Sequence, residues 1–384
     1  MSGLRVLITN LRLEGWTGTE LFVRDVARGL IKTGHRPVIY SPRLGPLAAE
    51  IRKETIPVID DLSQLSAPPD IIHGQHVNET LTALLHFERT PALYFCHDWY
   101  FPEDRPPRFP RIFRYATVDD QCYDKLVWEC GVPEERVHVI CQFVDLERFV
   151  PRAPLPARPR RAAVLCNHTK DNEHLRSARE ACERHGLTLD VYGAGVGNIC
   201  VRPEETLRDY DVVFAKGRAA LEAAAVGAAV VVYWWRRLGP MVKTHDLDRL
   251  RADGFGIRSM SPQLSPEEFG RSIEQVLEEY NPEDAAEISR RVRASAGRDL
   301  AVNELLRLYE EVISEYAATP IDRESEGRAA AAHVRNISLG FSQQRAAIFD
   351  STTIRFAEQL RRTPGLGKLA RAVARGVIGR RNQG

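Results

Sequence analysis

The sequence predicts an α/β protein with two doubly wound domains, in each of which helices cover both faces of a parallel sheet. Two observations predict this fold class. Short apolar, β-branched runs alternate with longer segments of helical periodicity. Four prolines and four arginines interrupt the alternation at residues 151–161, and it then begins again. Strands joined by helices do not pair as tight hairpins, so parallel β-α-β pairing is expected.

The first predicted domain covers residues 1–150. Its first strand is the apolar run LRVLIT at residues 4–9, and a helix follows in LFVRDVARGLIKTG, which ends at Gly34. Each further strand is a short apolar run between turn residues. These strands are expected at residues 37–41, 56–59, 70–73, 91–96, 115–118 and 137–141, with helices such as 78–87 and 119–129 between them.

After the linker at residues 151–161, the second predicted domain covers residues 162–317. Its strands are expected at residues 162–166, 187–193, 211–215 and 228–234, and a long charged helix at 281–317. The C-terminal part, residues 318–384, begins with a polar, Ala-rich surface connection. Open α/β sheets bind ligands beyond the carboxyl ends of their strands, so residues that follow strands are the functional candidates.

Composition narrows the class of protein. The 384 residues include 53 Lys and Arg against 52 Asp and Glu, a net charge of +1, which gives no sign of a nucleic-acid-binding surface. With 43% hydrophobic and 27% charged residues, the composition is globular. The seven cysteines are scattered without a Cys-x-x-Cys pair, so neither a disulfide framework nor a zinc site is expected. No apolar run suits a signal peptide or membrane span, and we expect a cytoplasmic protein.

A glycine-rich turn connects the first strand to the first helix. Backbone N–H groups at a helix start favour an anion, so Gly18, Thr19 and Glu20 are candidates for a loop that borders a phosphate or an acceptor. The alternative is an ordinary helix start, with Thr17 or Thr19 as the cap and Glu20 complementing the helix dipole. The turn matches neither a dinucleotide fingerprint nor a Walker loop.

His97 and Asp98 directly follow a predicted strand. In that place they are candidates for acid-base chemistry, because a carboxylate can hold a histidine in one tautomer or make it more basic. The alternative is a histidine that only forms structural hydrogen bonds. His73 and His76 follow the preceding strand, but these three histidines show no recognised ligand spacing, and no metal site is expected.

The first strand of the second domain is followed by Asn167, His168 and Lys170. A loop at this edge faces ligand, and the ammonium group of Lys170 is suited to neutralise a diphosphate. The alternative is a solvated turn, since Asn, Thr and Asp are common turn residues.

The most informative segment is DVVFAKGRAALEAAAVGAAVVVYW, residues 211–234. Its helix is small and apolar apart from Glu222, whose carboxylate therefore needs a partner. That partner is either a donor of the protein or the vicinal hydroxyls of a ribose. Lys216, Gly217 and Arg218 at the helix start favour an anion, and Gly239 after the next strand offers it further backbone N–H groups.

Four segments together resemble family 4 retaining glycosyltransferases of the GT-B fold, over about residues 4–315. GTELFVRDVARGLIKTGHRPVIYS is similar to the first β-α-β unit of that family. GVPEERVHVICQFVDLERFVP is similar to the end of its first domain, with matches at Val144, Asp145, Phe149 and Pro151. VYGAGVGN is similar to its strand-Gly-x-Gly segment, and ALEAAAVGAAVVV to its Glu-Ala-x-Ala-x-Gly-x-Pro-Val-Val segment.

The resemblance implies roles for the candidate residues. By it, Glu222 holds the ribose of a nucleotide sugar and Lys170 contacts the diphosphate. His97 lies by the sugar and acceptor, and Gly18 borders the phosphate and acceptor region. The chain departs from the family at Phe214, where a second acid that contacts the donor sugar is usual, and at Asn167 and His168, which stand near the usual Gly-Arg. Lys216 or Arg218 is our candidate to supply the missing phosphate contact.

The implied function is transfer of a hexose, with retention, from a UDP- or GDP-sugar to a glycan or glycolipid acceptor in polysaccharide biosynthesis, without a metal or a permanent cofactor. Two alternatives stay open: a nucleotide-sugar epimerase or hydrolase on the same fold, and a non-catalytic nucleotide-sugar-binding protein. Residues 361–381 have a basic amphipathic pattern, which either packs on the first domain or contacts an anionic membrane on its inner face.

Overall fold

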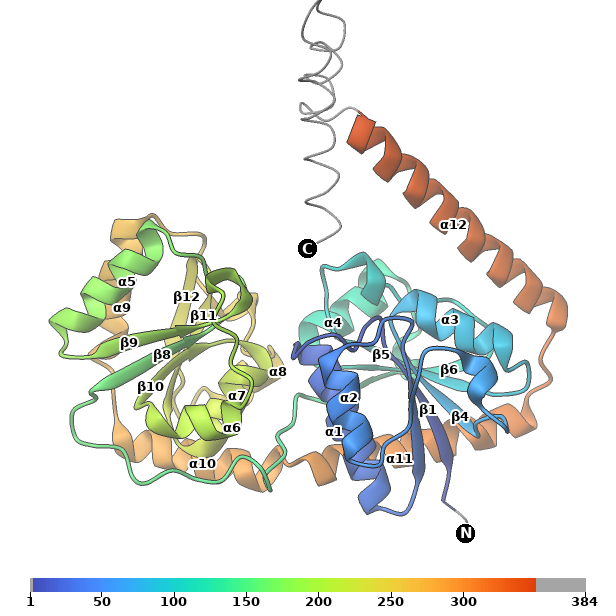
Figure 1. Ribbon diagram of the computed structural model, residues 1–384, viewed down its shortest axis with the longest axis horizontal. Helices are drawn as coiled ribbons and strands as arrows, with labels where there is room; N and C mark the ends of the chain where they lie inside the picture. Colours follow the sequence, from blue (N-terminus) through green and yellow to red (C-terminus); the bar gives the residue numbers. More distant parts are fainter. Residues whose placement is uncertain (1–2, 350–384) are drawn as a thin grey trace, which may run out of the picture. The chain divides into compact units, whose positions relative to one another are not determined.

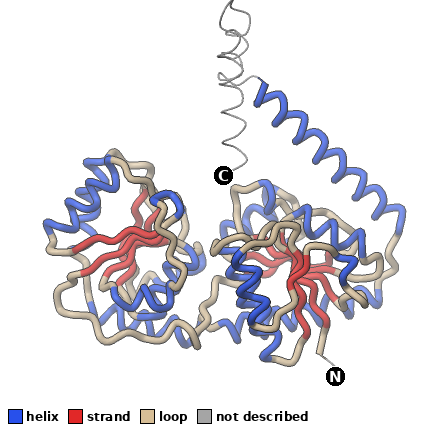
Figure 2. The backbone as a smooth tube through the Cα atoms, in the orientation of Figure 1, coloured by secondary structure: helices blue, strands red, loops and turns tan. Residues whose placement is uncertain are grey.

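The computed structural model describes residues 3–349 and contains two sheets, each with helices on both of its faces (Figures 1 and 2). The chain forms two units, divided after Ile321, and the first unit contains both sheets. We call the part around the larger sheet the first lobe and the part around the smaller sheet the second lobe. The predicted fold class is confirmed.

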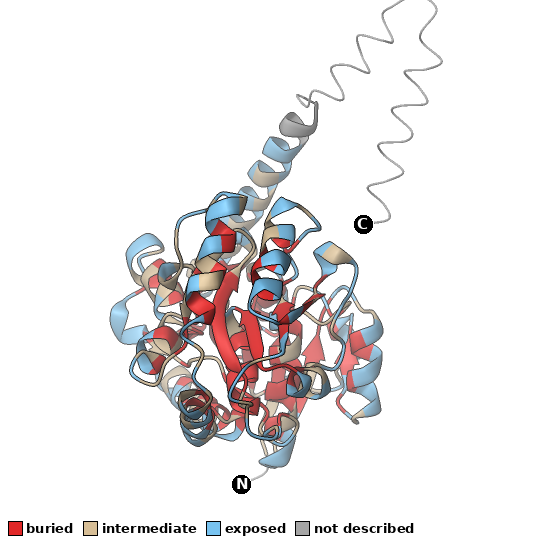
Figure 3. Cartoon of the chain, turned by 90° about the vertical axis from the view of Figure 1, so that its left-hand side faces the viewer, coloured by how far each residue is buried: buried red, intermediate tan, exposed pale blue. Residues whose placement is uncertain are grey.

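The first lobe has a seven-stranded parallel sheet in the order β3-β2-β1-β4-β5-β6-β7. The strands are β1 Arg5–Thr9, β2 Arg36–Tyr40, β3 Val58–Ile59, β4 Ile71–Gln75, β5 Ala92–Cys96, β6 Ile112–Thr117 and β7 Val137–Val139. The helices are α1 Gly18–Lys32, α2 Pro46–Lys53, α3 Val77–His86 and α4 Asp120–Asp124. The central strands β4 and β5 are buried along their whole length, which explains their continuous apolar runs. In Figure 3 the strands are mostly buried, and the outer sides of the helices are exposed.

The second lobe has a five-stranded sheet in the order β12-β11-β10-β8-β9. The strands are β8 Arg161–Leu165, β9 Thr188–Tyr192, β10 Val212–Ala215, β11 Ala229–Trp234 and β12 Arg237–Met241. The helices are α5 Glu173–Arg184, α6 Pro203–Thr206, α7 Gly217–Val226, α8 Leu247–Ala252, α9 Pro266–Leu277 and α10 Pro282–Ser295. Strand β12 is antiparallel and was not expected, because its Gly-Pro pair is unusual in a strand and is tolerated at the edge of a sheet.

The helix expected at residues 281–317 is two helices, because the chain turns at Ala296 and Gly297 between α10 and α11 (Arg298–Ala318). Helix α11 packs on the first lobe, so the expected boundary at residue 317 is wrong for this helix. Its Tyr309 is fully buried, and the hydroxyl lies 2.5 Å from Nδ1 of His73 on β4.

Two crossing segments, residues 142–150 and 296–299, connect the lobes and pair with each other. The N–H of Val144 donates to the carbonyl of Ala296 at 2.8 Å, and the N–H of Arg298 donates to the carbonyl of Val144 at 2.8 Å. Asp145 is buried, and its Oδ2 lies 2.8 Å from Nη1 of Arg298. The segment with the strongest family resemblance therefore builds the junction between the lobes.

The second unit contains helix α12 (Arg323–Phe349), which includes most of the expected surface connection at residues 318–335. Asp322 accepts hydrogen bonds from the N–H groups of Glu324 and Ser325 at the helix start, and alanines follow. Most of the expected surface connection is therefore helical. None of the described helices is long and apolar enough to cross a bilayer. Residues 361–381 lie outside the described residues, so the basic amphipathic helix stays a prediction.

Helices α1 and α11 approach each other closely at Gly29, where an added Cβ would lie 2.6 Å from Cγ2 of Val302. Gly→Ala in an open helix raises stability by up to about 1 kcal/mol, but here the methyl group forces the helices apart. We expect Gly29→Ala to lower the free energy of unfolding by about 1–3 kcal/mol, measured by chemical denaturation. In the double variant with Val302→Ala the loss should be smaller than the sum of the single losses. An additive loss, or a stabilising Gly29→Ala, would contradict this contact.

Candidate functional site

Three side chains meet at the carboxyl edge of the second sheet. His168 follows β8, Lys216 follows β10 and Trp234 ends β11, and these strands are neighbours. Nζ of Lys216 lies 4.6 Å from the centroid of the Trp234 ring, and the His168 ring stands edge-on to the same indole at 5.8 Å. The sequence placed His168 and Lys216 at this edge. It did not single out Trp234, because a tryptophan that ends an apolar strand is indistinguishable from a core residue.

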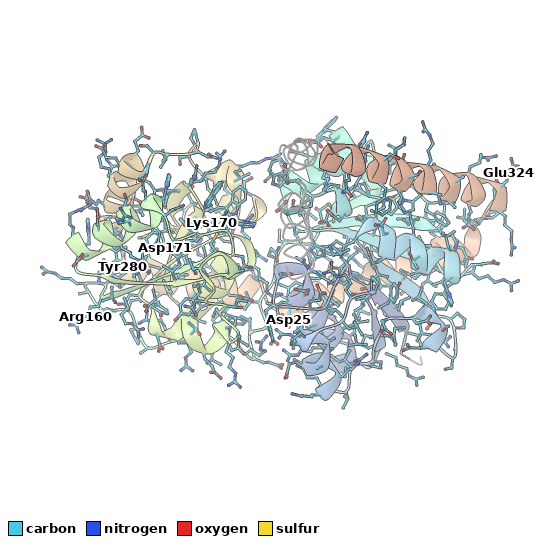
Figure 4. The ribbon with its side chains drawn as sticks, turned by 45° about the horizontal axis from the view of Figure 1, so that its top comes forward. Asp25, Arg160, Lys170, Asp171, Tyr280 and Glu324 are labelled. Atoms are coloured by element: carbon cyan, nitrogen blue, oxygen red, sulfur yellow. The ribbon has the colours of Figure 1, made fainter. Side chains whose placement is uncertain are left out.

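Positive charge at this edge is unpaired. Lys170 is exposed in the loop between β8 and α5 (Figure 4). Within residues 3–349, neither Lys170 nor Lys216 forms an ion pair with an acid. Desolvation lowers the pKa of His168, and the charge of Lys216 lowers it further, so the ring is neutral at neutral pH. Two unpaired ammonium groups raise the local concentration of anions.

The loop that carries Lys170 is anchored to its neighbours. Oγ1 of Thr169 lies 3.0 Å from the hydroxyl of Tyr233 on β11. Oδ1 of Asn167 accepts a hydrogen bond from the N–H of Ala194 at 3.2 Å. Asn167, which was predicted to bind the nucleotide sugar, therefore connects the loops after β8 and β9. The anchoring fixes the backbone next to Lys170 while its side chain stays in solvent.

Glu222, predicted to hold a ribose, is buried in α7 and has a protein partner. Nε of Arg218 donates to its Oε1 at 2.6 Å, so a donor of the protein occupies one of the two oxygens of this carboxylate. Nη2 of Arg218 donates to Asp25 of α1. Burial raises the pKa of Glu222, and Arg218 opposes the rise. Gly217, at φ +56°, makes the left-handed turn that opens the helix.

Arg218 was expected to contact a diphosphate from the helix start, but its side chain does not face solvent. Only 8% of its surface is exposed, and two carboxylates hold the guanidinium. Burial alone would lower the pKa of Arg218, but Asp25 and Glu222 outweigh burial and raise it. For Asp25, burial alone would raise the pKa, and Arg218, Arg24 and Arg148 outweigh it. Of the two candidates for the phosphate contact, only Lys216 is exposed.

Phe214 and Gly239 are both packed against other residues of the second lobe. Phe214, at the usual position of an acid, is 1% exposed and lies in the core of the second lobe against Tyr233. Gly239, expected to offer N–H groups to an anion, lies within β12. A Cβ there would be 2.7 Å from the carbonyl oxygen of Ser259 and 2.8 Å from Cβ of Val232. Close packing explains this glycine without a ligand.

His97 lies in an aromatic cluster at the carboxyl end of β5. Its ring centroid is 4.6 Å from that of Phe22 and 4.7 Å from that of Phe95. Burial lowers its pKa well below the usual value, helped by His76 and His73, so the ring is neutral. Nε2 is buried in this structure and has no hydrogen-bond partner among the described residues. A neutral ring with an unused nitrogen is suited to bond a hydroxyl group.

The acid that contacts His97 is Asp104, not Asp98. Oδ1 of Asp104 accepts from the backbone N–H of His97 at 3.1 Å. Oδ1 of Asp98 instead accepts from the N–H groups of Tyr100 and Phe101, at 2.6 and 3.1 Å, and shapes the turn after the strand. The sequence did not single out Asp104, because the loop between the two positions has no regular period.

The glycine-rich turn is an ordinary helix start in this structure. The buried carboxylate of Glu20 accepts hydrogen bonds from the N–H groups of Glu14, Gly15 and Thr17, at 2.8, 3.0 and 2.9 Å. The second alternative for this turn is therefore found, since Glu20 already occupies donors that an anion would need. Gly18 and Thr19 begin α1, and a Cβ at Gly18 would meet open space.

The other two histidines each have a hydrogen-bond partner of their own. Burial lowers the pKa of His73 to about 3 beside Tyr309. Burial lowers the pKa of His76 to about 4, and its Nδ1 accepts from the N–H of Leu11 at 3.1 Å. In the part of the chain that the structure describes, no cluster of three or more His, Cys, Asp or Glu side chains suits a metal ion.

Comparison with known proteins relates the first lobe to a family. Residues 16–148 match the model of the family described as Glycosyltransferase Family 4. A solved glycosyltransferase from Rickettsia africae matches 82% of this chain and 99% of its own length, with 14% identity and a TM-score of 0.56. The family match over residues 16–148 and the shared fold together support a family 4-like glycosyltransferase of the GT-B fold. The family resemblance noted in the sequence is confirmed. A sequence search of curated proteins gave no match to this glycosyltransferase.

Two further solved structures are similar in fold to this chain. The catalytic domain of starch synthase IV from Arabidopsis thaliana, bound to ADP and acarbose, matches 82% of this chain and 100% of its own, at 11% identity and a TM-score of 0.51. A putative UDP-N-acetylglucosamine 2-epimerase from Listeria monocytogenes matches 84% of this chain and 99% of its own, at 14% identity and a TM-score of 0.51. At such identities the likeness concerns the fold alone.

The loop beside His97 predicts a pH dependence. Burial raises the pKa of Asp104 to about 7, whereas an unfolded aspartate titrates near about 4. Between these values the folded protein keeps a proton that the unfolded chain has released, so the free energy of unfolding falls as pH rises through this window. We expect Asp104→Asn to reduce the loss of stability between pH 5 and pH 8, measured by urea denaturation.

The matched control for Asp104 is Asp171→Asn, which changes an exposed acid in the loop of Lys170 (Figure 4). This variant should keep the wild-type difference between the two pH values. If Asp104→Asn also keeps it, Asp104 does not carry a buried charge at pH 8.

Proposed function

We propose that this glycosyltransferase moves a hexose, with retention at the anomeric carbon, from a UDP- or GDP-sugar to a hydroxyl of a glycan or lipid-linked acceptor. The observation that supports the proposal is the unpaired positive charge of Lys170 and Lys216 at the carboxyl edge of the second sheet. Charge that develops on a departing diphosphate is stabilised by cations already held in place. We place the reaction in polysaccharide biosynthesis on the cytoplasmic side of a membrane.

In this proposal the two lobes have separate roles. Lys170 and Lys216 bind the diphosphate, and Glu222 accepts hydrogen bonds from the ribose. The acceptor approaches from the first lobe, where the unused Nε2 of His97 bonds a sugar hydroxyl. The acceptor proton passes to the departing diphosphate. The proposal assigns no step to a metal ion or a permanent cofactor.

A titration tests the donor class. Calorimetry with UDP, GDP and ADP should show binding of at least one of them, and Lys216→Met should weaken that binding about 10-fold or more, about 1.4 kcal/mol, by removing a phosphate contact. Lys243→Met is the control, because Nζ of Lys243 already pairs with Glu279 at 2.8 Å. No binding by the wild type would contradict the donor class, and unchanged binding by Lys216→Met would contradict the role of this edge.

Product analysis separates the proposal from its alternatives. The protein is incubated with the nucleotide sugar whose diphosphate binds, with and without a mixture of glycan acceptors. Glycosylated product that forms only with acceptor supports the transferase. An epimerised nucleotide sugar or free sugar without acceptor supports the epimerase or hydrolase, and binding without any product supports a non-catalytic protein.

A further inference from the structure

The side chain of Asp25 is fully buried in α1 and faces arginines from three parts of the chain. Its carboxylate pairs with Arg24 at 3.1 Å, Arg28 at 3.6 Å, Arg148 at 3.8 Å and, at shorter range, Arg218. Arg148 belongs to a crossing segment and Arg218 to α7 of the second lobe. An acid of the first lobe thus reaches a residue that also binds Glu222.

Asp25 and Glu222 share the guanidinium of Arg218. Nε donates to Oε1 of Glu222, and Nη2 donates to Asp25. These two nitrogens form the edge with which an arginine binds one carboxylate through two parallel hydrogen bonds. In this structure Nη2 is turned to Asp25, and only Nε donates to Glu222. Oε2 of Glu222 accepts no hydrogen bond from residues 3–349.

We propose that Asp25 is a positioning residue of the donor site: it holds Nη2 of Arg218 and so leaves Oε2 of Glu222 for the vicinal hydroxyls of the donor ribose. This inference rests on the proposed function. Asp25 contacts no substrate and acts through Arg218. When Asp25 loses its charge, Nη2 turns to Glu222, and the arginine occupies both oxygens of that carboxylate.

A structural role for Asp25 has to be separated from this one. Removing one partner from a buried group of charges destabilises a protein strongly, so a loss of stability alone does not distinguish them. The ribose hydroxyls do distinguish them, since only the positioning role connects Asp25 with these two groups of the ligand.

The experiment compares two ligands on two proteins. The full-length wild type and Asp25→Asn are each titrated by calorimetry with the best-binding of UDP, GDP and ADP, and with its 2′,3′-dideoxy form. We expect the wild type to bind the dideoxy form about 10-fold or more weakly. Asp25→Asn should bind the hydroxylated form about 10-fold more weakly than the wild type does, and the dideoxy form equally well.

The control is Asp299→Asn, which removes an acid that pairs at the surface with Lys32 at 2.6 Å and Arg298 at 3.2 Å. It should keep the wild-type preference for the hydroxyls. A second variant restores the arrangement in the Asp25→Asn background. Arg218→Lys presents a single ammonium group that cannot bind both oxygens side-on, so the double variant should regain much of the preference.

The outcomes separate the two proposals. If the wild type binds none of the nucleotides, the proposed function fails. If the wild type distinguishes the hydroxyls and Asp25→Asn distinguishes them equally, the role of Asp25 is overturned while the proposed function stands. Equal weakening of both ligands overturns it as well. Should Asp25→Asn not fold, Arg218→Lys alone should keep the preference within about 3-fold, and its loss would overturn the positioning role.

Discussion

A carboxylate removed from water needs cations around it, and the glycosyltransferase meets this need for Asp25 with arginines from α1, α7 and a crossing segment. The same arginines reach further acids: Arg218 binds Glu222, and Arg28 lies 3.6 Å from Asp145. Breaking a buried group of charges by removing one member costs about 3–5 kcal/mol. The first helix, the lobe junction and the helix of Glu222 are therefore held by one set of charges, and a change at any of them is felt at the others.

Local pattern was sufficient to predict the parallel strands of both sheets, but not the antiparallel strand β12 or the packing of distant segments. Buried parallel strands are continuous apolar runs, so they are recognisable without knowledge of their neighbours. Helix α11 has an equally clear helical pattern, yet nothing in that pattern says which lobe its Tyr309 covers. For Glu222 the need for a partner followed from an acid in an apolar helix. The identity of that partner, Arg218, and its second bond to Asp25 could not be predicted, because Arg218 and Asp25 are 193 positions apart in the sequence.

The candidate site shows the same limit at closer range. A glycine-rich turn before a helix suits an anion or a capping carboxylate equally, and only the position of the Glu20 oxygens decides between them. Gly239 lies in a segment whose composition suggested a ligand-binding loop, but it packs closely against Val232 and Ser259. Lys170 and Lys216 were predicted to contact a phosphate because they lie in segments that follow strands, where the topology of an open sheet places ligands.

The contact between His73 and Tyr309 has a consequence for the order of folding. These residues are 236 positions apart, and the whole second lobe lies between them in the sequence. At about 5–20 residues per second, a ribosome adds Tyr309 about 12–47 s after it has added His73. During that interval the nascent first sheet lacks the helix that covers β5 and β6. The first lobe of this glycosyltransferase therefore reaches its final packing only after the second lobe and α11 have been synthesised. A chain that stops earlier would leave the face of β5 and β6 uncovered, as a surface for chaperones to bind.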